Sequence, residues 1–139
     1  MRGPPDARGR LKREARAEAR ERFLQARMAV LDRVFDAASA SLGRMEVSRY
    51  TGRVAHLARD AARYLERGPA VLQSPPDAAP AAAAAIQDLS DLRVEPADVP
   101  AGVTGRSADG RVVVDNTLAA ILARRRADLA IGLGARIEK

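Results

Sequence analysis

The sequence has no cysteine, few aromatic residues and no long apolar run. Without cysteine the chain has no disulfide framework, no thiol chemistry and no thiolate metal site. Aromatic residues make up 3% of the chain, so the core must be built from alanine, valine, leucine and isoleucine. No apolar stretch approaches the roughly 18 residues of a membrane-spanning helix, and the N-terminus lacks an apolar signal segment. These absences lead us to expect a cytoplasmic protein.

Sequence motifs that carry chemistry are also missing. There is no phosphate-binding loop of the G-x-x-x-x-G-K-[ST] type, and no metalloprotease helix or nucleophile elbow. His56 is the single histidine, and it falls on the polar face of an expected helix with no cysteine or second histidine to work with. We expect no catalytic, cofactor-binding or metal-binding residues, and no enzyme activity.

The chain is basic, with a formal net charge of +6 over 139 residues. Of its 24 basic residues only Lys12 and Lys139 are lysines, which together with the heavy use of alanine indicates a GC-rich coding bias. The basic stretch from Arg8 to Arg33 has no aromatic interleaving for stacking on bases, and three glutamates interrupt it. We therefore expect no nucleic-acid partner. A basic nucleic-acid-binding helical protein is the least favoured of three functions considered, and the other two are given below.

A long helix is predicted at the N-terminus, because residues 10–42 contain no glycine or proline and consist largely of strong helix formers. A thin apolar stripe recurs in this helix at steps of 4, 4 and 3, an eleven-residue period that favours a straight or right-handed coiled coil. This partner-helix seam consists of Ala15, Ala19, Phe23, Ala26, Val30, Val34 and Ala37. Because a single domain cannot stabilise so thin a stripe along its whole length, we expect a partner helix.

The remainder of the chain predicts a compact domain with short strands. A second amphipathic helix runs from Val47 to Leu65, and Asp77 can cap a third helix. Asp109-Gly110 predicts a two-residue hairpin turn in which both residues have positive φ. The strands are predicted at 70–74, 92–95, 102–107 and 112–114.

The expected fold class is α+β. A long N-terminal helix, the coiled-coil arm (1–43), precedes a compact α/β domain (44–139). That domain has a small mixed sheet of about four strands flanked by helices, and the predicted element order is α-α-β-α-β-β-β-α.

The stretch Val112-Val113-Val114-Asp115-Asn116-Thr117 joins the last predicted strand to the last helix. Its three valines predict a strand buried on both faces. The strand is then expected to stop at Asp115, and Asn116 or Thr117 is expected to cap the final helix, 118–133. The three consecutive arginines at 124–126 are expected to face away from the domain.

This valine-rich strand followed by D-N-T-L resembles the end of the E subunit of V-type and archaeal-type ATPases/ATP synthases. The segment V-L-Q-S-P-P-D at 71–77 is similar to the earlier strand of that family, and the resemblance covers roughly residues 11–133. The family commonly has a glutamate three residues after the asparagine, where this chain has Ala119.

The resemblance implies a non-catalytic peripheral-stalk, or stator, subunit. Such a subunit links the catalytic head of a rotary proton- or sodium-translocating ATPase or ATP synthase to its membrane part. The implied partners are a second helical stalk subunit of the G or H kind, forming a heterodimer, and the ATPase head subunits. Contact with the membrane is made only through the complex. The related stator-like regulators of flagellar and type III secretion ATPases are the second alternative.

Overall fold

The computed structural model describes residues 6–137, and for Asp6 and residues 134–137 it describes the backbone alone. It confirms the predicted α+β fold and element order, with the last helix divided at Arg125. The elements are α1 (Asp6–Gly43), the 3-10 turn η1 (Val47–Arg49), α2 (Thr51–Arg63), β1 (Ala70–Ser74), α3 (Ala79–Ala85), β2 (Leu92–Pro96), β3 (Gly102–Ser107), β4 (Val113–Thr117), α4 (Leu118–Arg124) and α5 (Arg126–Ile137).

The chain divides into two compact units. One contains the described residues of 1–36 and 128–139, and the other, called the head unit below, consists of Ala37–Ala127. The domain boundary expected after residue 43 stays a prediction, and the ends of the two expected domains, 1–5 and 138–139, lie outside the described residues.

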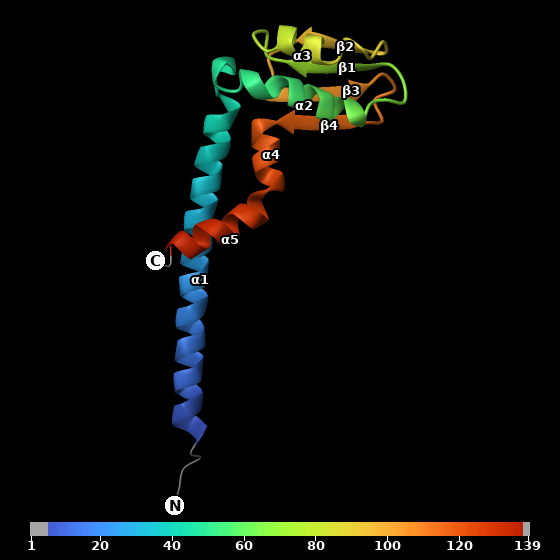
Figure 1. The fold of residues 1–139 in the computed structure, drawn as a ribbon. Helices are drawn as coiled ribbons and strands as arrows, with labels where there is room; N and C mark the ends of the chain where they lie inside the picture. The colour runs from blue at the N-terminus through green and yellow to red at the C-terminus, as the bar shows by residue number, and fades with distance from the viewer. Residues whose placement is uncertain (1–5, 138–139) are drawn as a thin grey trace, which may run out of the picture. The chain divides into compact units, whose positions relative to one another are not determined.

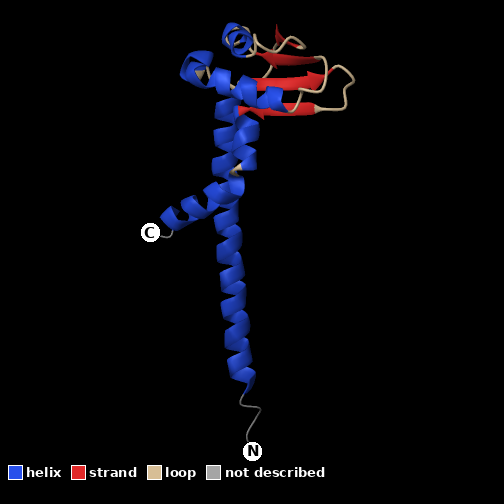
Figure 2. Ribbon diagram, turned by 45° about the vertical axis from the view of Figure 1, so that its right-hand side comes forward, coloured by secondary structure: helices blue, strands red, loops and turns tan. Residues whose placement is uncertain are grey.

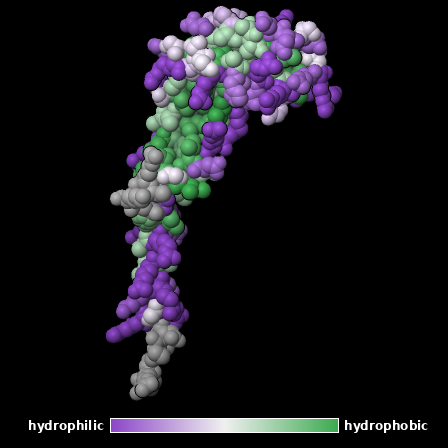
Figure 3. Space-filling view, in the orientation of Figure 1, coloured by the Kyte–Doolittle hydropathy of each residue, from purple (hydrophilic) through white to green (hydrophobic). Residues whose placement is uncertain are grey.

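α1 is one uninterrupted helix of 38 residues (Figure 2). At 1.5 Å per residue its length is about 57 Å. The N-terminal part of α1 presents a mainly hydrophilic surface, as its arginine and glutamate content requires (Figure 3). The helix ends at Gly43, where the sequence places its first glycine after Gly9.

The head unit is built on a four-stranded sheet with the strand order β2-β1-β3-β4 (Figure 1). β1 is parallel to β2 and antiparallel to β3, and β4 is antiparallel to β3. α2 and α3 contact one face of the sheet, and the inward-facing Leu72 and Val103 are fully buried. Alanines on α2 and α3 let the helices approach the sheet closely. The buried core is therefore mostly aliphatic, and Tyr50 is its aromatic member among the described residues.

The prediction that the three valines lie in a strand buried on both faces is wrong. Val112 precedes the strand, and Val113 is 64% exposed. β4 is an edge strand with β3 as its neighbour, and α2 contacts only one of its faces. Alternate residues of such a strand face away from the core, which is why a run of valines there is not buried throughout.

The turn at Asp109-Gly110 also differs from the prediction of two positive φ values. Gly110 has φ +73°, but Asp109 does not have a positive φ. The N–H of Gly110 donates to the carbonyl of Ser107 (2.9 Å), while Asp109 Oδ1 accepts from Ser107 Oγ (2.6 Å) and from the N–H of Arg111 (3.0 Å). These bonds, the one from Ser107 foremost, hold the pKa of the Asp109 carboxyl below its usual value. The hydrogen bonds of the Asp109 carboxylate are therefore made within the turn, and Gly110 is the residue of the turn that adopts the left-handed conformation.

Asp77 does not cap α3, contrary to the prediction. Ala78 is the N-cap residue, and it makes no side-chain cap bond. The N–H groups of Ala78 and Ala79 instead donate to the carbonyl of Pro75, at 2.9 and 3.1 Å. A backbone turn thus takes the role that the side chain was expected to fill.

Candidate functional site

The D-N-T motif forms the last three residues of β4, because the strand continues through Thr117 rather than stopping after Val114. Asn116 is 2% exposed and Thr117 is also buried, whereas Asp115 is exposed. The alternation of a strand sends the side chains of Asp115 and Asn116 to opposite faces of the sheet. The three polar residues therefore have three different sets of partners.

Thr117 is the N-cap residue of α4. Its Oγ1 accepts from the N–H of Ala120 at 3.2 Å, with extended backbone angles (φ −68°, ψ 156°). The same hydroxyl donates to Asp115 Oδ1 (2.7 Å), which also accepts from the N–H of Thr117 (3.0 Å). Asp115 thus orients the capping hydroxyl and satisfies one backbone donor at the end of the strand.

Asn116 connects β4 with two helices. Its Nδ2 donates to the carbonyl of Leu57 (3.0 Å) and to Asp60 Oδ2 (3.1 Å), both on α2. Its Oδ1 accepts from Arg124 Nη2 at the end of α4 (2.9 Å). The side chain uses its amide as donor and its carbonyl as acceptor at once, so it is a link between elements and makes none of the cap bonds of α4.

Arg124 completes this group, which we call the clasp: Asp60, Asp115, Asn116, Thr117 and Arg124. Besides its bond to Asn116, Arg124 donates from Nη1 to the carbonyl of Asp115 (2.8 Å). The prediction that all three arginines at 124–126 face away from the domain is therefore wrong for Arg124. A signal existed in the sequence: Arg124 lies two helical turns after Thr117, where a long side chain returns along its own helix toward the cap.

Gly102 was missed by the sequence prediction although it fixes the position of the clasp. It lies opposite Thr117 in the sheet and has φ +124°. A Cβ at this position would lie 2.5 Å from Thr117 Cα and 2.7 Å from the carbonyl oxygen of Asn116. Only glycine allows this approach of the two strands.

Tyr50 contacts the same place from the start of α2. The N–H of Gly102 donates to the Tyr50 hydroxyl at 3.3 Å. Burial raises the pKa of the Tyr50 phenol, and the bond from Gly102 opposes part of this rise. The clasp is thus held in place by α2, which packs on one face of β4, and by the adjoining end of β3 in the sheet.

The partner-helix seam on α1 is exposed in all seven of its positions, from Ala15 to Ala37. Phe23, the largest side chain of the seam, is 56% exposed. The seam is therefore an apolar stripe that the described part of the chain does not cover.

A second apolar stripe runs along α1, and the prediction of the seam did not include it. Its residues recur at alternating steps of 4 and 3, the heptad spacing of left-handed helix packing. They are Leu24, Met28, Leu31, Phe35, Ala38 and Leu42. Phe35 is only 5% exposed, in contrast to Phe23 on the seam. The heptad spacing was the signal that could have identified this stripe from the sequence.

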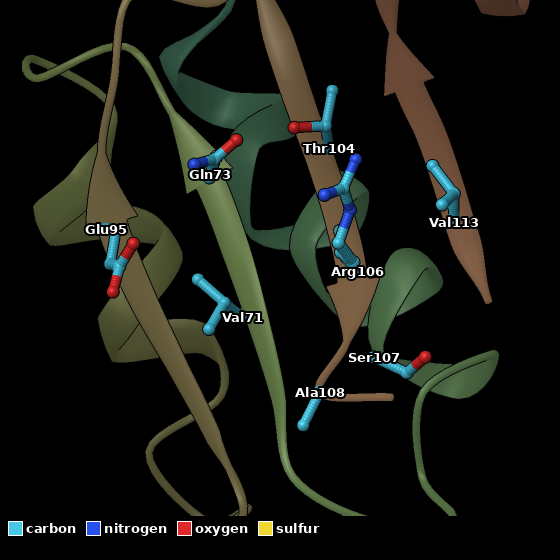
Figure 4. A pocket seen from close by; sticks show the side chains of 9 residues that line it. Val71, Gln73, Glu95, Thr104, Arg106, Ser107, Ala108 and Val113 are labelled. Atoms are coloured by element: carbon cyan, nitrogen blue, oxygen red, sulfur yellow. The ribbon is translucent and has the colours of Figure 1, made fainter. Parts of the chain in front are cut away.

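The open face of the sheet carries a shallow hollow of about 400 Å³ (Figure 4). Its lining side chains include Val71, Gln73, Glu95, Thr104, Arg106 and Val113. In register, Arg106 lies between Val71 and Val113, while Glu95 is beside Gln73 in the next row. Among the described residues no group of three histidine, cysteine, aspartate or glutamate side chains is placed to hold a metal ion.

Comparison with protein families matches the chain to one family. The family of the ATP synthase (E/31 kDa) subunit matches residues 8–130, a span that includes the seam, the whole sheet and the clasp. A comparison with individual curated proteins gave no match. None of the helices within residues 6–137 is both long and apolar enough to cross a membrane. Since the family match covers most of the 139 residues, the chain belongs to the E subunits of V-type and archaeal-type ATPases/ATP synthases.

Proposed function

We propose that this chain is a non-catalytic peripheral-stalk subunit of a rotary proton- or sodium-translocating ATPase or ATP synthase. In this proposal α1 pairs with a second helical subunit of the G or H kind, and the head unit docks on the stationary ATPase head. The observation that carries the proposal is the exposed seam on an uninterrupted helix of 38 residues.

The physical reason lies in the cost of exposing the seam. Burying one large apolar side chain is worth about 1.5–3 kcal/mol, and three seam residues, Phe23, Val30 and Val34, are large and exposed. The eleven-residue period of the seam matches a straight or right-handed pair of helices. A partner helix along the seam would cover these side chains and stiffen α1 against bending.

The task of a stator explains why one chain combines a long helix with a small α/β unit. A stator resists the torque of the rotating shaft, so it needs an extended element and an anchor on the stationary head. The proposed place of the chain is on the cytoplasmic side, at the membrane only through the complex. Both partner contacts are protein surfaces, and the proposed role uses no bound cofactor.

Reconstitution tests this function. The purified chain is mixed with its helical partner and with the ATPase head, and the complex is analysed by size-exclusion chromatography with light scattering. We expect a ternary complex from the wild-type chain. A wild-type chain that stays monomeric beside both partners would exclude the stator function.

Two aspartate variants separate the seam from α1 as a whole. Val30→Asp places a charge in the seam, whereas Gln25→Asp places the same side chain at an exposed polar position of the same helix. We expect Val30→Asp to weaken binding of the helical partner about tenfold or more, and Gln25→Asp to change it less than about threefold. Equal effects of both variants would show that the seam is not the contact.

A further inference from the structure

The exposed apolar surface of the head unit is concentrated at one place. The large apolar side chains that are exposed in the described head unit are Tyr64, Val112 and Val113, and the first and last are each 64% exposed. All three line the same hollow of about 280 Å³, which is bordered by Asp60 and Arg124 of the clasp. An aromatic residue beside aliphatic ones, with an arginine at the rim, is the composition typical of a protein-binding surface.

The backbone of β4 shows what kind of partner fits this surface. Val112 accepts from the N–H of Ser107 and Leu118 donates to the carbonyl of Ala101, both at 2.9 Å. The even-numbered residues of β4 therefore form the backbone bonds to β3. The N–H and carbonyl groups of Val113, Asp115 and Thr117 point the other way, toward the open edge of the sheet.

The clasp occupies the end of this free edge. Arg124 donates a hydrogen bond to the carbonyl of Asp115, and the side chain of Asp115 accepts one from the N–H of Thr117. Within the described residues, the N–H and carbonyl of Val113 and the N–H of Asp115 have no hydrogen-bond partner. Three adjacent backbone groups therefore remain open, and they lie next to the exposed apolar side chains.

We propose that an extended segment of the ATPase head adds to β4 as a short fifth strand, paired at Val113. This inference rests on the proposed function, because the seam of α1 serves the helical partner and the second partner needs a surface on the head unit. Main-chain bonds at an open sheet edge select an extended peptide, and hollows beside the edge select its side chains.

The two faces of β4 define the sequence of that segment. Successive side chains of an added strand point to opposite faces of the sheet. On the helix-covered side they meet the hollow with Tyr64, which takes an apolar side chain. On the open side they meet the hollow with Val113 and Arg106, which face each other in register, and there an acidic side chain is matched (Figure 4). The expected segment therefore has apolar residues toward the helix-covered side and one acidic residue on the open side, beside Val113 and Arg106.

Val113→Pro tests the main-chain pairing. Proline removes the outward N–H of Val113 and leaves the β3–β4 hydrogen bonds in place, and edge strands tolerate proline at such positions. Val113→Thr is the matched control, because it keeps the N–H and the β-branched shape. Binding of each purified variant to the immobilised ATPase head is measured. We expect Val113→Pro to weaken binding about tenfold or more and Val113→Thr to change it less than about threefold.

Tyr64→Ala and amide exchange keep the test independent of how well the proline variant folds. Tyr64 is exposed, so its removal should leave the fold intact while weakening head binding about tenfold. In the wild-type complex with the ATPase head, the amide hydrogens of Val113 and Asp115 should exchange more slowly than in the free chain. Binding of the helical partner should stay unchanged in every variant.

The outcomes separate the two proposals. If the wild-type chain binds the ATPase head but its Val113 and Asp115 amides gain no protection, strand addition is overturned and the stalk function stands. The same holds if folded Val113→Pro binds as tightly as wild type. If these amides gain protection in the free chain as its concentration rises, the occupant is a second copy and the inference is wrong. If the wild-type chain does not bind the head at all, both proposals fall.

Discussion

The head unit and the seam of α1 both contain many alanines, but the head unit buries many of its alanines and the seam exposes its own. In the head unit, alanines such as Ala58 and Ala61 are fully buried between helix and sheet. On the seam, Ala15, Ala19 and Ala26 are exposed. The buried polar side chains are paired as well: among the described residues no buried side-chain nitrogen or oxygen lacks a hydrogen-bond partner. The alanines of the head unit thus contribute to the chain's own core, whereas those of the seam lie on the surface that we propose for the partner helix.

The two phenylalanines of the sequence repeat this contrast within a single helix. Phe23 belongs to the seam and is 56% exposed, whereas Phe35 belongs to the heptad stripe and is 5% exposed. Both are in α1, twelve positions apart in the sequence. The heptad stripe is covered only in part, because Leu24 and Met28 are 46% and 63% exposed. The contrast therefore holds for the two phenylalanines and not for the two stripes as a whole.

The largest effect is expected for Phe35→Ala. Truncating a buried phenylalanine removes its transfer free energy and leaves a cavity, so the free energy of unfolding should fall by about 4 kcal/mol. Chemical denaturation of the purified chain measures this value. A loss below about 1 kcal/mol would show that Phe35 is not covered in solution.

Gly102→Ala should be the next most damaging change. The new Cβ would lie 2.5 Å from the backbone of Thr117, and alanine rarely adopts φ +124°. Together these costs should lower the free energy of unfolding by about 3 kcal/mol. Gly110→Ala is the matched control, because that glycine also has a positive φ but has open space around it. The control should lose only about 1 kcal/mol. Equal losses would mean that backbone conformation alone, and not the close approach, makes Gly102 necessary.

Asn116→Ala should lower the free energy of unfolding by about 2 kcal/mol. The substitution leaves the buried carbonyl of Leu57 without its side-chain donor and releases Arg124 from the clasp. Asn116→Asp is a useful second variant: it keeps an acceptor for Arg124 but loses the donor to Leu57 and places a carboxylate beside Asp60. We expect it to be at least as unstable as the alanine variant. A stable Asn116→Asp protein would contradict the assigned donor role.

Thr117→Ala should cost about 1 kcal/mol, the usual value of an N-cap side chain. Thr117→Ser keeps the hydroxyl and should recover most of the loss. Since the cap begins a helix of seven residues, the effect should appear as faster amide exchange at the start of α4. If alanine and serine variants have the same stability, the hydroxyl does not contribute to the cap.

The order of elements could be predicted from the sequence because it depends on local signals. The long stretch without glycine or proline predicted α1. The short strands were predicted from several local signals: alternation at 92–95, the consecutive valines at 112–114 and the Asp109-Gly110 turn between the last two strands. The D-N-T-L motif after the valines pointed to the correct family, as the match over residues 8–130 shows.

The partners of the clasp could not be predicted in the same way. Asn116 bonds to Leu57 and Asp60, which are 59 and 56 positions away in the sequence, so its role depends on α2 passing beside β4. The exposure of Val113 depends likewise on strand order, because only the assembled sheet makes β4 an edge. Local patterns determine which elements form, whereas these side chains obtain their roles from how the elements meet.

The smallest effect on the free chain is expected for Phe23→Ala. An exposed side chain that contacts little contributes little, so the free energy of unfolding should change by less than about 0.5 kcal/mol. Amide exchange of the free chain should show slow exchange only from about Phe23 onward, because the seam before it consists of alanine. With the helical partner bound, protection should extend toward Arg10, and Phe23→Ala should then weaken the complex about tenfold. Strong protection from Arg10 onward in a monomer, independent of concentration, would show that α1 needs no partner and that the exposed seam is not the surface for one.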